Sequence, residues 1–282
     1  MIVDSHHHLW RLEDGYTWLD ALELAPIRRT FTPDELVAEL DKAGVDRTIL
    51  VEGGRCDPDE AALLLAYAQD TPQIGGVVVW ADLTDPGLAD RLAGYRDLPG
   101  GDWIVGVRAQ IQGEPDPDYL DRPDVHRGLR AVAAAGLAYD LVVTVDQLPA
   151  AARAAAVLPE VRFVLDHLGK PRIRAGADGL AQWRVPVAAL AAAPNTSAKL
   201  SGLVTEADWG GWRVEDLRPY VTEAVELFGP DRLMFGSDWP VCLLAAGYDE
   251  VKSALEQALP PITEQEKRAI FGSTAARVYS VG

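Results

Sequence analysis

Cysteine is scarce in this sequence. Cys56 and Cys242 are the only two among 282 residues, too few for a disulfide framework. No run of about 18 uninterrupted apolar residues occurs, and the alanine-rich stretch Val185–Ala193 is interrupted at once by Pro194. The N-terminus lacks the basic region, apolar run and cleavage site of a signal peptide. We therefore expect a cytoplasmic protein that does not insert into a membrane.

Basic residues are few relative to acidic ones. The 26 Lys and Arg residues face 43 Asp and Glu residues, which gives a formal charge of −17 and a pI near 4.6. Such a chain is repelled by nucleic-acid phosphates and by anionic lipid. We therefore expect a small-molecule substrate and neither nucleic acid nor membrane as a partner. The sequence leaves open whether the chain forms a homo-oligomer.

A dinucleotide-binding glycine motif is also absent. No G-x-G-x-x-G follows the first apolar run, which disfavours an open doubly wound sheet. The chain instead has eight short apolar runs rich in β-branched residues, as expected for parallel strands covered by helices. We predict strands at Ile2–His8, Arg47–Glu52, Gly76–Asp82, Ile104–Ile111, Tyr139–Val145, Arg162–His167, Thr196–Gly202 and Arg232–Ser237.

Helical patterns lie between these runs. Thr32-Pro33-Asp34-Glu35 combines a capping residue, a proline at the first helical position and acids in the first turn, and Asp57-Pro58-Asp59-Glu60 repeats the pattern. Eight alternating units in a chain of this length predict a single-domain (β/α)8 TIM barrel over residues 1–282.

Two of the predicted loops, Trp10–Thr30 and Gly169–Gly179, are long enough to form walls of an active site. Further helices are predicted at Ala131–Gly136, Gln147–Val157, Leu180–Ala193 and Val214–Phe228.

Two histidines end the first predicted strand. Because side chains alternate along a strand, His6 and His8 point to one side and His7 to the other. In a barrel the shared side is the lumen, and the carboxyl ends of the strands carry the chemistry. A structural core histidine or the remnant of a tag are the alternatives, and the apolar sequence on both sides argues against a tag.

Polar residues also close the sixth and eighth predicted strands. His167 follows Phe163–Asp166, and Asp238 follows Phe235–Ser237. Each alone is compatible with a helix cap or a loop acid. Together with His6 and His8, they place three imidazoles and one carboxylate around one rim. This set suits zinc or a similar divalent ion, and it equally suits metal-free general-base catalysis.

Other residues near the strand ends are candidate substrate contacts. Arg108 suits a carbonyl or carboxylate, with an ion pair to a barrel acid as the alternative, and Glu52 suits sugar hydroxyls. Lys170 is either a substrate contact or a surface lysine. Lys199 lies inside a predicted strand and, if buried, needs a partner of opposite charge. His126 is expected at the start of a helix, in a surface role.

Eight tryptophans are present. Four of them fall at or just after strand ends, and we expect two of the four to line the substrate pocket, with Trp10 and Trp239 as the candidates. Indole faces pack against the C–H faces of sugars, although tryptophan also fills protein cores. The four are Trp10, Trp80, Trp209 and Trp239.

Three motifs in order resemble the amidohydrolase superfamily. They are similar above all to its branch of sugar-lactone hydrolases and 2-pyrone-4,6-dicarboxylate lactonase, and the resemblance extends over essentially the whole chain. The motifs are Asp4-Ser5-His6-His7-His8-Leu9-Trp10, Asp166-His167-Leu168-Gly169-Lys170-Pro171 and Gly236-Ser237-Asp238-Trp239-Pro240. Gly106-Val107-Arg108, Glu114-Pro115-Asp116-Pro117 and Leu200-Ser201-Gly202-Leu203 agree with it.

The resemblance implies roles for the rim residues. His6, His8 and His167 would be the site histidines, catalytic or metal-binding, and Asp238 the acid that activates water. Many metal-dependent members have a further histidine after the next strand, whereas this chain reads Ser197–Gly202 there, without one. The implied cofactor is therefore either one divalent ion, zinc or manganese, or none.

The activity that the resemblance implies is hydrolysis of a small sugar lactone (an aldonolactone) to its open acid by Asp-activated water. The nearest alternative is a metal-dependent decarboxylase or amide hydrolase of the same superfamily. The sequence favours a sugar-acid binding protein without catalysis, or a scaffolding barrel, less strongly. No G-x-S-x-G serine motif is present, so no serine nucleophile is expected.

Overall fold

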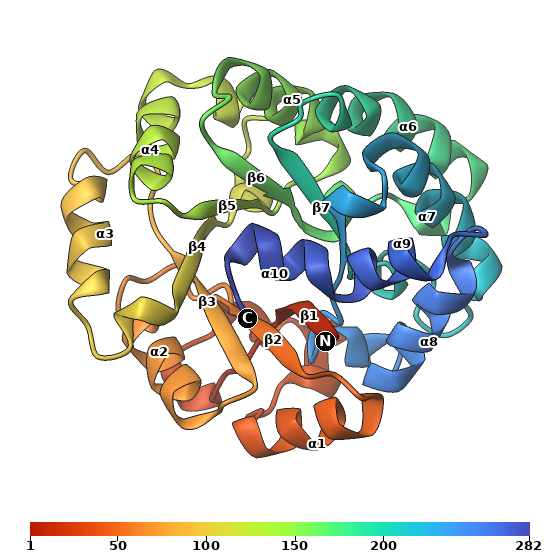
Figure 1. The fold of residues 1–282 in the computed structure, drawn as a ribbon, viewed down its shortest axis with the longest axis horizontal. Coiled ribbons are helices and arrows are strands. Elements are labelled where there is room, and N and C mark those ends of the chain that lie inside the picture. The colour runs from red at the N-terminus through yellow and green to blue at the C-terminus, as the bar shows by residue number, and fades with distance from the viewer.

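A computed structural model describes all residues 1–282. Eight parallel strands pair in sequence order, and the eighth joins the first where His7 bridges Trp239, so the sheet closes into a barrel ringed by helices (Figure 1). This confirms the predicted (β/α)8 fold. The strands are β1 Val3–His7, β2 Arg47–Val51, β3 Ile74–Trp80, β4 Ile104–Ala109, β5 Ala138–Leu141, β6 Arg162–Leu165, β7 Thr196–Leu200 and β8 Leu233–Phe235.

The helices cover the outside of the barrel. No helix is both long enough and apolar enough to cross a lipid bilayer. The helices are α1 Pro33–Ala43, α2 Glu60–Asp70, α3 Leu88–Arg96, α4 Pro123–Ala134, α5 Leu148–Val157, α6 Ala177–Ala191, α7 Val214–Phe228, α8 Tyr248–Ala258, α9 Glu264–Arg268 and α10 Thr274–Tyr279.

Of the two helix starts predicted from a capping residue followed by proline, the one at Thr32 is confirmed and the one at Asp57 is wrong. Thr32 caps α1 with the reciprocal hydrogen bonds of a capping box to Glu35. Asp57 does not cap a helix: its side chain accepts a hydrogen bond from the Asp59 N–H at 2.8 Å and forms a turn. The helix α2 therefore begins only at Glu60. The helix predicted from Ala131 begins at Pro123, and it holds His126 in its first turn.

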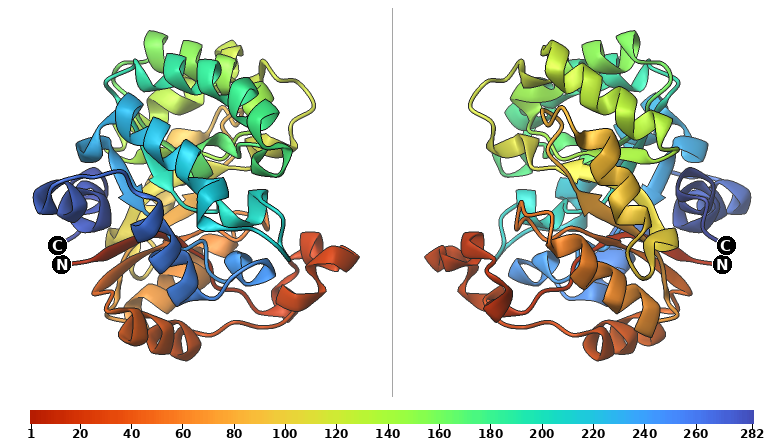
Figure 2. Two further views of the ribbon diagram at one scale, coloured as in Figure 1. Left: turned by 90° about the vertical axis from the view of Figure 1, so that its right-hand side faces the viewer. Right: turned by 90° about the vertical axis from the view of Figure 1, so that its left-hand side faces the viewer.

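The C-terminal helix closes one end of the barrel. Ala275 and Val278 of α10 pack with Val3, Val164 and Met234 from the strands in one buried apolar cluster. In the side views, both termini and α10 lie at this end, and the segment of short 3-10 helices between Leu12 and Ile27 projects beyond the opposite, carboxyl end (Figure 2). Only the carboxyl end of the barrel is therefore open to a ligand.

Candidate active site

The first strand directs two histidines into the barrel. His6 and His8 bring their Nε2 atoms to 3.1 Å from each other. His7 points the opposite way, where its Nδ1 lies 2.6 Å from the Thr48 hydroxyl. The predicted alternation is confirmed, and it gives His7 a place outside the barrel lumen.

His167 lies just beyond β6, in an unusual turn. The residues from His167 to Lys170 all have positive φ, between 52° and 74°, and only Gly169 among them has no Cβ. Left-handed backbone costs other residues roughly 1–2 kcal/mol each, and such strain clusters at functional sites. The Trp183 indole N–H holds the turn by donating to the Leu168 carbonyl at 2.6 Å. The turn ends β6 at Leu165, earlier than predicted, and brings the His167 ring beside Ser201, with Nδ1 to Oγ at 2.9 Å.

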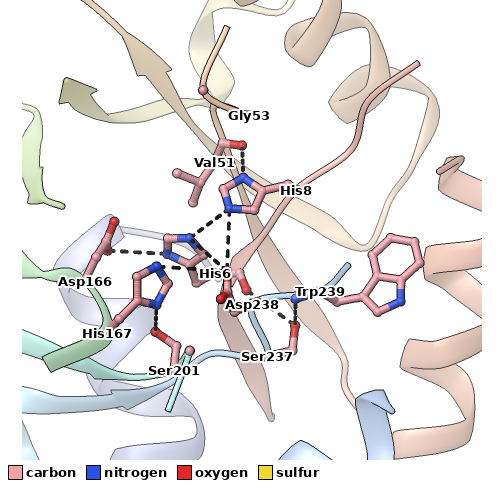
Figure 3. Close-up of polar contacts among 12 residues, drawn as sticks. His6, His8, Val51, Gly53, Asp166, His167, Ser201, Ser237, Asp238 and Trp239 are labelled. Atoms are coloured by element: carbon pink, nitrogen blue, oxygen red, sulfur yellow. Dashed lines mark hydrogen bonds and ion pairs between the residues drawn. The ribbon is translucent and has the colours of Figure 1, made fainter. Parts of the chain in front are cut away.

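Asp238 lies just beyond β8 and is also left-handed, with φ of 58°. Its N–H donates to the His6 carbonyl at 2.8 Å. Its Oδ1 lies 3.7 Å from His8 Nε2, 3.8 Å from His6 Nε2 and 4.0 Å from His167 Nε2. One carboxylate oxygen thus faces three imidazole nitrogens, as Figure 3 shows. The three carboxylate–imidazole separations exceed direct hydrogen-bond lengths and leave room for one small ligand atom between the groups.

A glycine permits this close approach. Gly202 follows β7 with φ of 62°, and a Cβ at this position would lie 2.5 Å from His167 Nδ1 and 3.1 Å from Asp238 Oδ2. Any larger residue would have to displace one of these two side chains. The Leu200-Ser201-Gly202 motif therefore serves the site in two ways, through the Ser201 hydroxyl and through the missing side chain of Gly202.

Burial sets the protonation of the site. It lowers the pKa of His167 to about 4, and it lowers the pKa of His6 well below its usual range, with further lowering by Lys199. Burial alone would raise the pKa of Asp238, but the nearby His167 and His8 outweigh it and leave that pKa below its ordinary value. At neutral pH, a carboxylate therefore faces neutral His6 and His167 rings.

A layer of buried charges lies beneath His6. The Lys199 ammonium contacts Asp140 at 2.6 Å and Asp166 at 2.9 Å, and Arg108 contacts Asp166 at 3.0 Å and Glu52 at 2.5 Å. Together the carboxylates and cations satisfy one another where isolated charges would be very costly. The lysine within β7 thus has the partners that its burial requires, and Arg108 takes the ion-pair alternative.

The cavity at the carboxyl end has a volume of about 330 Å³. His8, Arg108, His167, Lys170 and Asp238 all lie in its wall. Lys170 reaches it from the left-handed turn, with its Nζ 3.7 Å from the Glu206 carboxylate. The site residues predicted from β1, β4, β6 and β8 are thus brought together.

Three predicted substrate contacts lie elsewhere. Glu52 is fully buried, and its carboxylate binds Arg108 and Gln110, so it positions other side chains. Trp10 and Trp239 are 0% and 2% exposed, and both pack edge-on against Phe31. Trp10 also packs against Tyr16 and Trp18, and both indoles belong to the core.

A different tryptophan lines the cavity. Trp18 comes from the loop predicted to form a wall, and its indole N–H donates to the Gly53 carbonyl at 2.8 Å. Gln110 and Gln112 follow β4 and also line the cavity. Nothing in their sequence context marks these three residues, because loop conformation decides which side chains reach the cavity.

The donor set fits one divalent cation. His6, His8 and Asp238 each offer a ligand atom within one small cluster, and the separations of 3.1 to 3.8 Å bracket the roughly 3.3 Å between ligands of tetrahedral zinc at 2.0–2.1 Å. His8 Nδ1 donates to the Val51 carbonyl at 2.9 Å, which leaves a lone pair on Nε2. His6 Nδ1 lies 3.4 Å from Asp166 Oδ1 and 3.2 Å from Lys199 Nζ, and this Asp166–Lys199 ion pair, 2.9 Å long, is placed to hold the ring of the second ligand.

The family model described as amidohydrolase matches residues 3–281. A barrel with this rim of histidines and one aspartate defines the class, and the chain belongs to the amidohydrolase family. It is 41% identical to the L-fucono-1,5-lactonase of Burkholderia multivorans, over 99% of this chain and 96% of that protein. A second L-fucono-1,5-lactonase, from Burkholderia ambifaria, is 35% identical, with 99% and 95% covered.

A solved structure resembles the whole chain. It is an amidohydrolase from Burkholderia multivorans with bound zinc, which superimposes with a TM-score of 0.93 at 39% identity and covers all of both chains. A divalent cation therefore occurs in a close structural relative, and the His6, His8 and Asp238 cluster is suited to one.

Proposed function

We propose that this protein hydrolyses a small sugar lactone to its open acid, with L-fucono-1,5-lactone as the leading candidate substrate. The observation that carries the proposal is the position of Asp238, whose carboxylate faces three imidazoles in the wall of a cavity large enough for a sugar ring. Whole-length identity of 41% to an L-fucono-1,5-lactonase supports the choice of substrate.

Asp238 is the proposed general base. Its pKa lies below the ordinary value, so it is ionised at neutral pH and accepts a proton from a water molecule aimed at the lactone carbonyl. The protonated carboxyl then returns that proton to the ring oxygen as the C–O bond breaks. One residue serves both halves of the reaction, and the water oxygen ends in the product carboxylate.

The developing oxyanion requires donors and positive charge nearby. Lys170 lies in the cavity wall and supplies a donor and a positive charge, and His167 lies on the same wall as a neutral ring. The Arg108 guanidinium is paired with Glu52 and Asp166. His6, His8 and Asp238 would hold a divalent cation, which when bound polarises a carbonyl and acidifies water. The buried charges beneath His6 keep its ring in place.

We further propose that residues 1–282 act as one catalytic unit of the cytoplasm on a small-molecule substrate. The proposed catalytic residues lie at the carboxyl ends of strands β1, β6 and β8 of one barrel, and both cysteines are free thiols.

Acid release in weak buffer with a pH indicator tests the proposal. The panel contains L-fucono-, L-rhamnono-, D-galactono- and D-glucono-lactones in 1,4- and 1,5-forms. Each is run with untreated enzyme, with chelator, and after addition of zinc or manganese. We expect rapid acid release from the L-fucono-1,5-lactone series. Folded enzyme that hydrolyses no lactone in the presence of either metal would overturn the proposal.

A further inference from the structure

A second cavity lies beside the catalytic one. Its volume is about 360 Å³, and the two cavities share Cys56 and Gln110 in their walls. It opens at the ends of β3 and β4, on the same face of the barrel as the site. The catalytic mechanism uses none of the residues that this cavity adds.

Two aromatic side chains line this second cavity. Trp80 ends β3 and is half-buried, and no acceptor within the chain binds its indole N–H. Tyr119 is only 6% exposed, yet its hydroxyl makes no hydrogen bond within the chain. Burial and the nearby Glu114 and Asp82 carboxylates raise the pKa of Tyr119 to about 12, so the phenol remains a donor. The cavity thus holds unpartnered donors beside aromatic rings.

The remaining polar groups favour a neutral ligand rich in hydroxyls. Asp82 Oδ1 accepts from the N–H and the hydroxyl of Thr84, both at 2.8 Å, while its Oδ2 has no partner. Glu114 adds a second carboxylate, and the Arg122 guanidinium is already paired with Asp124 at 2.6 Å. The negative charge of Asp82 and Glu114 in the cavity wall repels ligands that carry a carboxylate or a phosphate. Sugar hydroxyls donate to such carboxylates and accept from a phenol or an indole N–H, and sugar C–H faces pack on aromatic rings.

We propose that the second cavity is a subsite for a neutral sugar ring, and that the enzyme accepts aldonolactones carrying a glycosyl group. The lactone ring occupies the catalytic cavity, and the glycosyl group extends past Gln110 onto Trp80 and Tyr119. The inference about substrate rests on the proposed lactonase function, whereas the subsite itself does not.

Binding of simple glycosides tests the subsite without turnover. Saturation-transfer NMR is run with methyl α-L-fucopyranoside, methyl β-D-galactopyranoside and methyl β-D-glucopyranoside. We expect at least one to bind, to lose its signal in Trp80→Ala, and to keep it in Trp18→Ala, which alters only the catalytic cavity. Trp209→Ala is the matched control, since its exposed indole lines neither cavity. Absence of binding, or binding lost in Trp18→Ala but kept in Trp80→Ala, would overturn the subsite.

Kinetics test the substrate class. D-glucono-1,5-lactone is compared with its 4-O-galactosyl derivative, lactobiono-1,5-lactone. We expect the derivative to have the higher kcat/KM through a lower KM, and Trp80→Ala to reduce the ratio of the two kcat/KM values roughly fivefold to tenfold. Tyr119→Phe and Glu114→Gln, which keep the side-chain volume, should reduce it in the same direction. A ratio unchanged in all three variants would contradict the inference.

The two proposals fail in different ways. If glycosides bind at Trp80 but no lactone is hydrolysed, the subsite stands and the lactonase function fails. If lactones are hydrolysed but no glycoside binds, the lactonase function stands and the subsite is wrong.

Discussion

Glu60 is a buried acid whose ionisation should govern stability near neutral pH. It is fully buried at the start of α2, and its Oε1 accepts from the Tyr16 hydroxyl at 2.9 Å and the Gly53 N–H at 2.8 Å. Its Oε2 has no partner. Burial, reinforced by the nearby Glu52 charge, raises the pKa of Glu60 to about 7 from an ordinary 4.5. Glu60 thus ties the first and second βα loops together at a cost that depends on pH.

The magnitude follows from the shift in pKa. The unfolded chain releases this proton near pH 4.5 and the folded chain near pH 7, so the contribution to stability falls as pH rises between these values. At 1.36 kcal/mol per pKa unit, the loss between pH 5 and pH 8 is about 2–3 kcal/mol. Glu60→Gln keeps the shape and both hydrogen bonds to Oε1 while removing the charge, so this loss disappears.

Urea unfolding at pH 5, 6, 7 and 8 measures the effect. We expect the free energy of unfolding of Glu60→Gln, relative to the parent, to increase by about 2–3 kcal/mol from pH 5 to pH 8. Taking the difference cancels the contributions of the buried histidines. Glu215→Gln, an exposed glutamate in the first turn of α7, is the matched control and should show no trend. A constant difference for Glu60→Gln across this range would refute the reasoning.

Three further predictions concern the site and the layer beneath it. Lys199→Met leaves Asp140 and Asp166 without their shared cation, and urea unfolding should show a loss of about 3–5 kcal/mol; a loss below 1 kcal/mol would contradict this. Gly202→Ala places a Cβ against His167, so kcat should fall at least about tenfold with only about 1–2 kcal/mol of destabilisation, whereas Gly210→Ala, with open space around it, should change neither. Calorimetric titration should show one zinc ion bound per chain, with an affinity at least about a hundredfold weaker in His8→Asn. The control His126→Asn should bind zinc as the parent does, and an unchanged affinity in His8→Asn would show that His8 is not a zinc ligand.

The fold and the rim of the site could be predicted because they depend on local patterns. Apolar runs give the strands, and a polar residue directly after such a run marks the open end of a barrel. His6, His8, His167 and Asp238 were found in this way, and the structure brings them together. The strands β6 and β8 end earlier than predicted. The positive φ of His167 and Asp238 was not predicted either, because nothing in the sequence around these residues indicates it.

The cavity wall could not be predicted in the same way. Trp10 and Trp18 both follow β1, but the fold of the Leu12–Ile27 segment buries the first and exposes the second to the cavity. Glu52 lies directly after β2, which ends at Val51, and Arg108 from β4 pairs with its carboxylate. Such pairings join strands that are distant in sequence, so a single sequence contains no local signal for them.

The role of Asp238 is the central claim, and one comparison tests it most directly. The parent enzyme and Asp238→Asn are assayed for acid release from L-fucono-1,5-lactone, or from the best lactone of the panel, with circular dichroism confirming the fold of each. Asp102→Asn, an exposed aspartate before β4, is the control and should retain full activity. We predict that Asp238→Asn loses about 10²–10⁴-fold in kcat. A folded Asp238→Asn enzyme within tenfold of the parent would contradict the account.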